Sequence, residues 1–208
     1  MGVIEVGKLN LGLHSFAHRH LRIGGVREQL AGVAPEDLVF VDESGVNRGM
    51  TRWYARSPRG QRAYGSAPRN YGSNVSVLGA LSLAGPLASL HVTGAADADL
   101  FRLFVKEVLV PVLWPGAVVV VDNLSIHKAA GVQEVIEAAG ARLVYLPPYS
   151  PDLNPIEFAW SKFKTHLRKA AARTTKALHQ ALTEALAAIS PTDAQGYFRH
   201  CGYCGSPA

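Results

Sequence analysis

Apolar residues along this chain form short continuous or alternating runs and longer runs with helical spacing. The short runs predict strands, and they cover residues 38–41, 75–83, 87–92, 117–121 and 142–146. The second and third runs are separated by Ala84-Gly85-Pro86, which predicts a hairpin. We also expect a strand within 51–63, interrupted by a turn at Pro58-Arg59-Gly60.

Helical spacing accounts for most of the remaining chain. Asp97 or Asp99 can cap a helix whose apolar positions recur until Trp114-Pro115-Gly116 ends it. A second helix is expected from about Lys128 until Gly140 stops it. Two long helices over 155–172 and 175–189, and a short one near the C-terminus, complete the prediction.

The order of these elements predicts an α/β fold of the ribonuclease-H-like type. Antiparallel strands come first, and a strand, a helix and a strand then form a crossover whose strands must be parallel. We expect a mixed sheet with helices on both faces. The predicted domain covers residues 37–203, after a short segment 1–36 without clear periodicity and before a tail, 204–208.

Three acidic residues stand where predicted elements begin or end. Asp42 and Asp122 each follow a continuous apolar strand, and Glu157 lies just inside the helix that Asn154-Pro155 opens. Three such carboxylates can hold a pair of divalent cations for phosphoryl transfer. Each acid also has an ordinary interpretation, since Asp42 and Asp122 suit turns or caps. Glu157 could complete a capping box with Asn154.

Three neighbouring residues are further candidates for the site. Glu43 is a rival ligand to Asp42, and Asn123 could assist Asp122. His127, five residues beyond Asp122, could position a water, a phosphate or the nucleophile. Its ordinary interpretation is a surface histidine at the start of a helix.

Charge is distributed unevenly along the chain. The net charge is +5, with a pI of about 9.4, and two stretches, 45–96 and 158–183, contain basic residues but no acid. This pattern favours contact with a phosphate backbone. The candidate contacts are Arg56, Arg59, Arg62, Lys162, Lys164 and Arg168.

Other features exclude several classes of protein. Cys201 and Cys204 form a single C-x-x-C without a second pair, so we expect a structural role rather than a zinc site, although His200 is adjacent. No signal-peptide pattern is apparent, and the apolar runs are too short to span a bilayer. We expect a cytoplasmic protein without a membrane partner.

Three segments resemble the DDE endonucleases of bacterial insertion-sequence transposases related to mariner. They are VFVDESG (39–45), VVVDNLSIHK (119–128) and LPPYSPDLNPIE (146–157), and YARSPRG (54–60) also fits. The last run is the most specific, and the resemblance covers roughly residues 37–203.

The resemblance implies a ribonuclease-H-like core that cleaves and joins DNA strands at transposon ends. It assigns the metal-binding catalytic acids to Asp42, Asp122 and Glu157, with two Mg²⁺ (or Mn²⁺) ions as cofactors. The expected partners are transposon ends and target DNA, bound by a homodimer at the bacterial nucleoid. Family members also carry an N-terminal helix-turn-helix region, for which residues 1–36 are too short. Another reading frame could supply it.

Two alternatives remain open from the sequence. The chain could be an inactive, DNA-binding remnant that regulates a full-length transposase, or a generic ribonuclease-H-like nuclease that cuts DNA without joining ends.

Overall fold

A computed structural model describes residues 25–26, 28–52 and 54–204 of the chain. Its centre is a five-stranded sheet in the order β3-β2-β1-β4-β5. The strands are β1 (Leu38–Val46), β2 (Val75–Ser82), β3 (Gly85–Thr93), β4 (Val118–Val121) and β5 (Arg142–Tyr145). The first three pair antiparallel, whereas β4 is parallel to β1 and β5 is parallel to β4. The predicted mixed sheet is thus confirmed.

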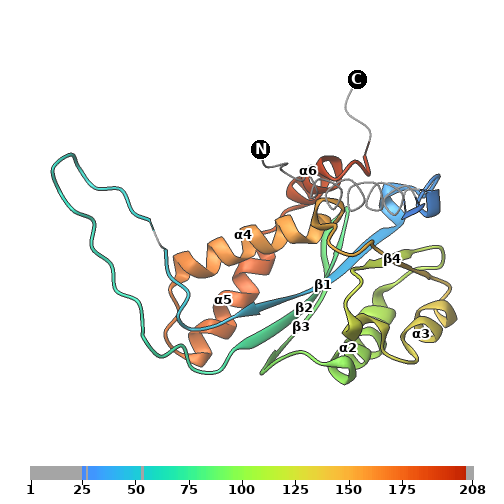
Figure 1. Cartoon of the computed structure of the whole chain (residues 1–208), viewed down its shortest axis with the longest axis horizontal. Coiled ribbons are helices and arrows are strands. Elements are labelled where there is room, and N and C mark those ends of the chain that lie inside the picture. Colours follow the sequence, from blue (N-terminus) through green and yellow to red (C-terminus); the bar gives the residue numbers. More distant parts are fainter. Residues whose placement is uncertain (1–24, 27, 53, 205–208) are drawn as a thin grey trace, which may run out of the picture.

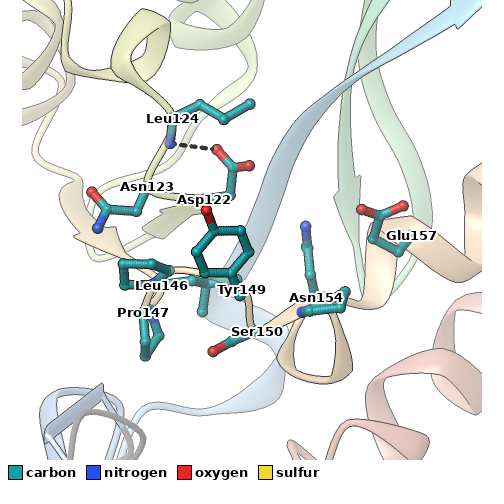
Figure 2. Close-up of a pocket in the computed structure, with 11 residues that line it drawn as sticks. Asp122, Asn123, Leu124, Leu146, Pro147, Tyr149, Ser150, Asn154 and Glu157 are labelled. Atoms are coloured by element: carbon teal, nitrogen blue, oxygen red, sulfur yellow. Dashed lines mark hydrogen bonds between the residues drawn. The ribbon is translucent and has the colours of Figure 1, made fainter. Parts of the chain in front are cut away.

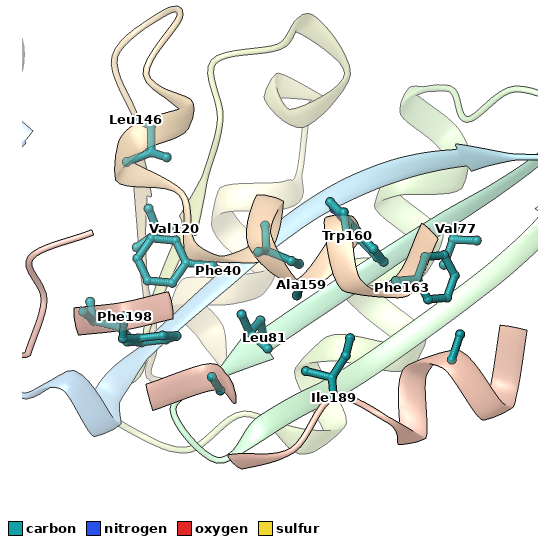
Figure 3. Close-up of a cluster of buried hydrophobic side chains, with 14 of the residues drawn as sticks. Phe40, Val77, Leu81, Val120, Leu146, Ala159, Trp160, Phe163, Ile189 and Phe198 are labelled. Carbon is teal, nitrogen blue, oxygen red and sulfur yellow. The ribbon is translucent and has the colours of Figure 1, made fainter. Parts of the chain in front are cut away.

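Helices cover both faces of this sheet (Figure 1). One face carries α4 (Pro155–Ala170), α5 (Thr175–Ala187) and α6 (Pro191–His200), and the other carries α2 (Ala98–Phe104) and α3 (Val132–Ala138). Because side chains alternate along a strand, β1 and β4 supply both cores. Phe40 and Val120 face α4 and α6, where Phe198 packs edge-on against Phe40 (Figure 3). Val39 and Val119 face Phe101 and Phe104 of α2 on the other side.

The first strand is longer than its apolar run predicts. β1 continues through Asp42 to Val46, because residues 43–46 pair with residues 75–78 of β2. The interpretation of Asp42 as a turn residue is therefore wrong, and Asp42 lies inside the strand rather than at its end.

The strand expected within 51–63 is also wrong. Between β1 and β2 the described residues form neither helix nor strand. This segment, residues 47–52 and 54–74 and called the arm below, extends away from the domain (Figure 1). An extended segment becomes a strand only when another strand pairs with it, and the arm lies beyond the reach of the sheet. At its base, the Arg173 guanidinium donates to the carbonyls of Arg48 (2.9 Å) and Met50 (3.0 Å).

The helices differ from the prediction mainly in how they start and end. Asp97 caps α2 by accepting from the Leu100 N–H at 2.8 Å. The same helical run then continues as a π-helix over Val105–Leu109 and a 3-10 helix over Val110–Val112. α3 starts only at Val132, and Ser125–Lys128 is a separate 3-10 helix. In the described part of the chain, every helix is too short or too polar to cross a membrane.

Candidate active site

Asp42 is held in the middle of the sheet, under helix α4. Its side chain is only 5% exposed. One carboxylate oxygen accepts from the Glu43 N–H at 2.8 Å and the other from the Trp160 indole N–H at 3.2 Å. Burial, with smaller contributions from the negative charges of Glu157 and Asp122, raises the pKa of Asp42 to about 7. Because Asp42 is buried, a cation that reaches it stabilises the charged form of its carboxylate.

Gly79 makes room for the tryptophan that holds Asp42. Gly79 pairs with Asp42 across β1 and β2, and the Trp160 ring lies directly over it. A Cβ atom at position 79 would stand 2.6 Å from the Trp160 ring. The absence of a side chain therefore lets α4 approach the sheet closely enough for Trp160 to reach Asp42.

Asp122 directly follows β4, as its sequence position predicts. One of its carboxylate oxygens accepts from the Leu124 N–H at 3.0 Å (Figure 2) and lies 2.5 Å from Nδ1 of His127. Partial burial alone would raise the pKa of Asp122, but the hydrogen bonds from His127 and Leu124 outweigh it. The pKa is consequently below its ordinary value. Asp122 is thus held in its charged form.

His127 is a buried residue that orients Asp122. Its side chain is fully buried and packs against Phe101, with ring centroids 4.5 Å apart. The Tyr145 hydroxyl donates to the His127 carbonyl at 3.2 Å. The interpretation as a surface histidine is therefore wrong. Sequence spacing could not reveal this, because contacts with α2 and β5 bury the ring.

Glu157 stands in the first turn of α4, but it does not form the capping box that the sequence suggested. The Asn154 side chain makes no cap hydrogen bond, and the Asn154 N–H donates to the Pro151 carbonyl instead. The capping interpretation is wrong. The Glu157 carboxylate faces the same pocket as Asp122 (Figure 2).

That pocket lies between the loop after β4 and the loop that leads into α4. It is lined by Asp122, Asn123, Leu124, Leu146, Pro147, Pro148, Tyr149, Ser150, Pro151, Asn154 and Glu157. Tyr149 was not singled out from the sequence. It is 94% exposed and has a φ of 58°, which is rare for a bulky residue. An exposed aromatic ring held in this conformation beside acidic groups is typical of a binding site.

The three predicted acids lie near one another at this end of the sheet but are not in direct contact. Asp122 and Glu157 line the pocket, whereas Asp42 is buried and its charge interacts with both. Among the described residues, no three His, Cys, Asp or Glu side chains form a ready-made metal cage. The donors are nevertheless hard oxygen ligands of the kind that Mg²⁺ and Mn²⁺ prefer, so the residues fit such ions.

The rival ligand Glu43 points to the opposite face of β1 from Asp42. One of its carboxylate oxygens is buried without a hydrogen-bond partner among the described residues. Burial raises the pKa of Glu43, His127 lowers it, and the charge of Asp122 raises it further. Glu43 therefore lies on the His127 side of the site and remains a candidate ligand.

The basic candidates occupy two regions. Arg56, Arg59 and Arg62 are exposed on the arm, and Lys164 and Arg168 are half-buried on α4. Lys162 differs from these because its ammonium lies 2.5 Å from the Asp193 carboxylate of α6. Lys162 therefore links two helices.

The two cysteines are structural in character. Both are free thiols, and Cys201 is buried. Burial raises the pKa of Cys201 to about 12, so the thiol stays protonated and unreactive.

Comparisons with known proteins agree on family and fold. Residues 37–179 match the model of the DDE superfamily endonuclease family. Comparison of the sequence with curated proteins gave no significant match. Among solved structures, the Mos1 strand transfer complex has a TM-score of 0.71 at 17% identity, covering 96% of this chain and 63% of that chain.

Two further solved structures give the same picture. The Mos1 mariner paired end complex with Mn has a TM-score of 0.69 at 17% identity, covering 96% of this chain and 64% of that one. The catalytic domain of Mos1 mariner transposase has a TM-score of 0.61 at 14% identity, covering 94% and 92%. This chain thus has the ribonuclease-H-like fold of that catalytic domain and spans less than two thirds of the longer Mos1 chains.

Proposed function

The chain belongs to the DDE superfamily endonuclease family, and from this premise we propose that it is the catalytic domain of a transposase. It cleaves DNA at transposon ends and transfers the cut strand to target DNA. Residues 37–203 form the catalytic domain, and a homodimer acts on DNA in the bacterial cytoplasm.

One observation carries this proposal. Asp122 and Glu157 line a single pocket, and Asp42 lies behind it, close enough for both to raise its pKa. These acids come from β1, the residue after β4 and the first turn of α4, which are remote along the chain. Their convergence in a family of endonucleases supports metal-dependent phosphodiester chemistry. The Mos1 structures solved with Mn or Mg support the same kind of ion here.

The chain's own residues prepare the site for this chemistry. Trp160 and the Glu43 N–H fix both oxygens of Asp42, and His127 fixes Asp122. Asp42, Asp122 and Glu157 would hold two Mg²⁺ or Mn²⁺ ions. When bound, such ions lower the pKa of an attacking water or 3′-hydroxyl and stabilise the leaving oxygen. Asn123 lines the pocket and would contact the DNA strand there.

The basic residues supply affinity for the DNA backbone. Arg56, Arg59 and Arg62 extend outward on the arm, and Lys164 and Arg168 lie on α4, the helix that also carries Glu157. Such contacts neutralise phosphates whatever the base sequence. Lys162 contributes less, because Asp193 already neutralises its charge.

Nicking of supercoiled DNA tests the proposal. We expect the wild-type protein to convert supercoiled plasmid to the open circle with Mg²⁺ or Mn²⁺ but not with EDTA. Asp122→Ala should lower the rate at least about 100-fold, because it removes a group that acts on the reacting phosphate.

Asp99→Ala is the matched control, since Asp99 is an exposed acid on α2 that pairs with Arg102 away from the pocket. It should nick at the wild-type rate. Equal nicking by wild type and Asp122→Ala would rule out the catalytic assignment of Asp122. DNA binding without nicking would indicate a regulatory remnant, and cleavage without strand-transfer products a plain nuclease.

A further inference from the structure

Asn154 has the sequence position of a helix cap but not the geometry of one. It precedes Pro155, the first residue of α4, and asparagine is among the preferred N-cap residues. Its ψ is 94°, whereas the capping residues Asp97, Thr174 and Ser190 have ψ of −180°, 157° and 163°. Those three side chains each accept a backbone N–H, and that of Asn154 does not. The Asn154 backbone therefore turns its amide away from the helix.

The amide is directed into the pocket instead. Asn154 is only 4% exposed, and its Oδ1 is buried without a hydrogen-bond partner among the described residues. Figure 2 shows its side chain rising toward the space between Asp122 and Glu157, with the amide nitrogen at the tip. Burying the acceptor Oδ1 without a partner is unfavourable on its own. The donor end of the same amide, Nδ2, stands at the tip of the side chain, where a ligand in the pocket can reach it.

The surroundings indicate which ligand this is. Asp122 and Glu157, on either side of the amide, are acidic and would repel the phosphate of a DNA strand. A neutral N–H group between two carboxylates can donate a hydrogen bond to an anionic oxygen there without competing for the cations that the acids would hold. The side-chain amide of Asn154 meets this requirement.

We propose that the Asn154 side-chain amide donates a hydrogen bond to a non-bridging oxygen of the DNA phosphate undergoing cleavage. This inference rests on the proposed function and adds a substrate-binding residue to its site. The Asn154 side chain does not cap α4, and its amide faces the substrate instead. The residue therefore contributes to the rate of strand cleavage and little to the stability of the helix.

The full chain carrying Asn154→Ala tests this division, with Thr174→Ala as its matched control. Thr174 caps α5 by accepting from the Ala177 N–H at 3.1 Å. We expect Asn154→Ala to nick supercoiled plasmid with Mn²⁺ about 100-fold more slowly at saturating protein, with its Tm within about 1 °C of wild type, since no cap is lost. Thr174→Ala should nick at the wild-type rate, with a Tm lower by about 2–4 °C.

Two substitutions separate the donor from the shape of the side chain. Asn154→Asp keeps the size but replaces the N–H donor by a charge of the same sign as the phosphate, so nicking should fall at least as far as in Asn154→Ala. Asn154→Ser can form an ordinary N-cap, so its Tm should equal or exceed that of wild type while nicking stays slow.

The outcomes distinguish this inference from the function on which it rests. Wild-type nicking rates in Asn154→Ala or Asn154→Asp, with Asp122→Ala inactive, would overturn the inference alone. A Tm loss in Asn154→Ala like that of Thr174→Ala would also overturn it, because the side chain would then be acting as a cap. A wild-type protein that does not nick, or nicks no faster than Asp122→Ala, would overturn both.

Discussion

The surroundings of Asp42 and Asp122 shift the pKa values of these two aspartates in opposite directions. Asp42 lies inside the sheet, where burial raises its pKa to about 7. Asp122 stands at the end of β4, where hydrogen bonds from His127 and Leu124 outweigh burial and lower its pKa. The residues that matter at this scale are therefore those that hold the acids, Trp160 and His127.

Gly79→Ala tests how Asp42 is held. A methyl group at position 79 would meet the Trp160 ring at 2.6 Å, so the ring must shift and lengthen its hydrogen bond to Asp42. We expect a loss of about 1–3 kcal/mol in the free energy of unfolding, the usual cost of overpacking. Urea denaturation measures this loss, and plasmid nicking should slow in parallel.

Gly45→Ala is the control for that substitution. Gly45 lies in β1, and a Cβ atom there would meet nothing within 4 Å. Its stability should equal or slightly exceed that of wild type, because alanine restricts the unfolded chain. Equal losses in the two variants would show that the space over Gly79 has no special importance.

At the scale of elements, α4 organises the site. It carries Trp160 and Glu157, and Asn154 precedes it. Its outer side is joined to α6 through Lys162, whose ammonium contacts Asp193. Asp193 also completes a capping box with Ser190. The position of α4 thus depends on α6, a helix that carries none of the candidate site residues.

Asp193→Asn tests this connection and its dependence on pH. The hydrogen bonds from Lys162 and Ser190 lower the pKa of Asp193 from 3.8 to about 2. A lowered pKa contributes stability that is fully present above about pH 4 and lost as the pH falls toward 2. We expect the substitution to cost about 1 kcal/mol at pH 7, with the difference from wild type disappearing near pH 2 in urea titrations.

Asp99→Asn is a suitable control for Asp193→Asn. Asp99 forms an exposed ion pair with Arg102 within α2, and exposed pairs contribute little. Its stability should match that of wild type over the same range of pH. A difference between Asp193→Asn and wild type that stayed constant down to pH 2 would contradict the assigned ionisation.

At the scale of the whole molecule, the arm is the feature that packing of the hydrophobic core does not account for. Its described residues are largely exposed, and its tyrosines Tyr54, Tyr64 and Tyr71 are 92%, 88% and 49% exposed. Beyond its base, which Arg173 holds, a segment with this much exposed aromatic and basic surface adds little to the stability of the domain. We therefore assign it to DNA contact under the proposed function.

Replacing Arg56, Arg59 and Arg62 together by alanine tests the arm. The side chains are exposed, so the Tm should be unchanged. DNA affinity should fall by a similar factor for unrelated duplexes, and the slope of log K against log salt should decrease by about 3. Fluorescence anisotropy across a salt series measures both quantities.

Lys106→Ala serves as the control, since Lys106 is an exposed residue beside Glu107 on the α2 side of the sheet. It should leave the salt slope unchanged. An unchanged slope in the triple variant would show that the arm does not touch the phosphate backbone.

The sequence predicted the sheet and the candidate acids because those features depend on local pattern. Four successive valines define β4, and the acid after them lies where parallel strands deliver ligands. The resemblance of residues 146–157 to DDE endonucleases identified Glu157. These inferences needed no knowledge of which segments meet in space.

Only the tertiary structure decided the surroundings of those acids. Pairing with β2 carries β1 past Asp42, contacts with α2 and β5 bury His127, and the backbone before α4 turns Asn154 from a cap into a pocket residue. Each outcome depends on a segment distant along the chain. Hydrophobic periodicity indicates which residues are buried, but it does not indicate which neighbour buries each of them. That neighbour determines the pKa and the orientation of a polar side chain.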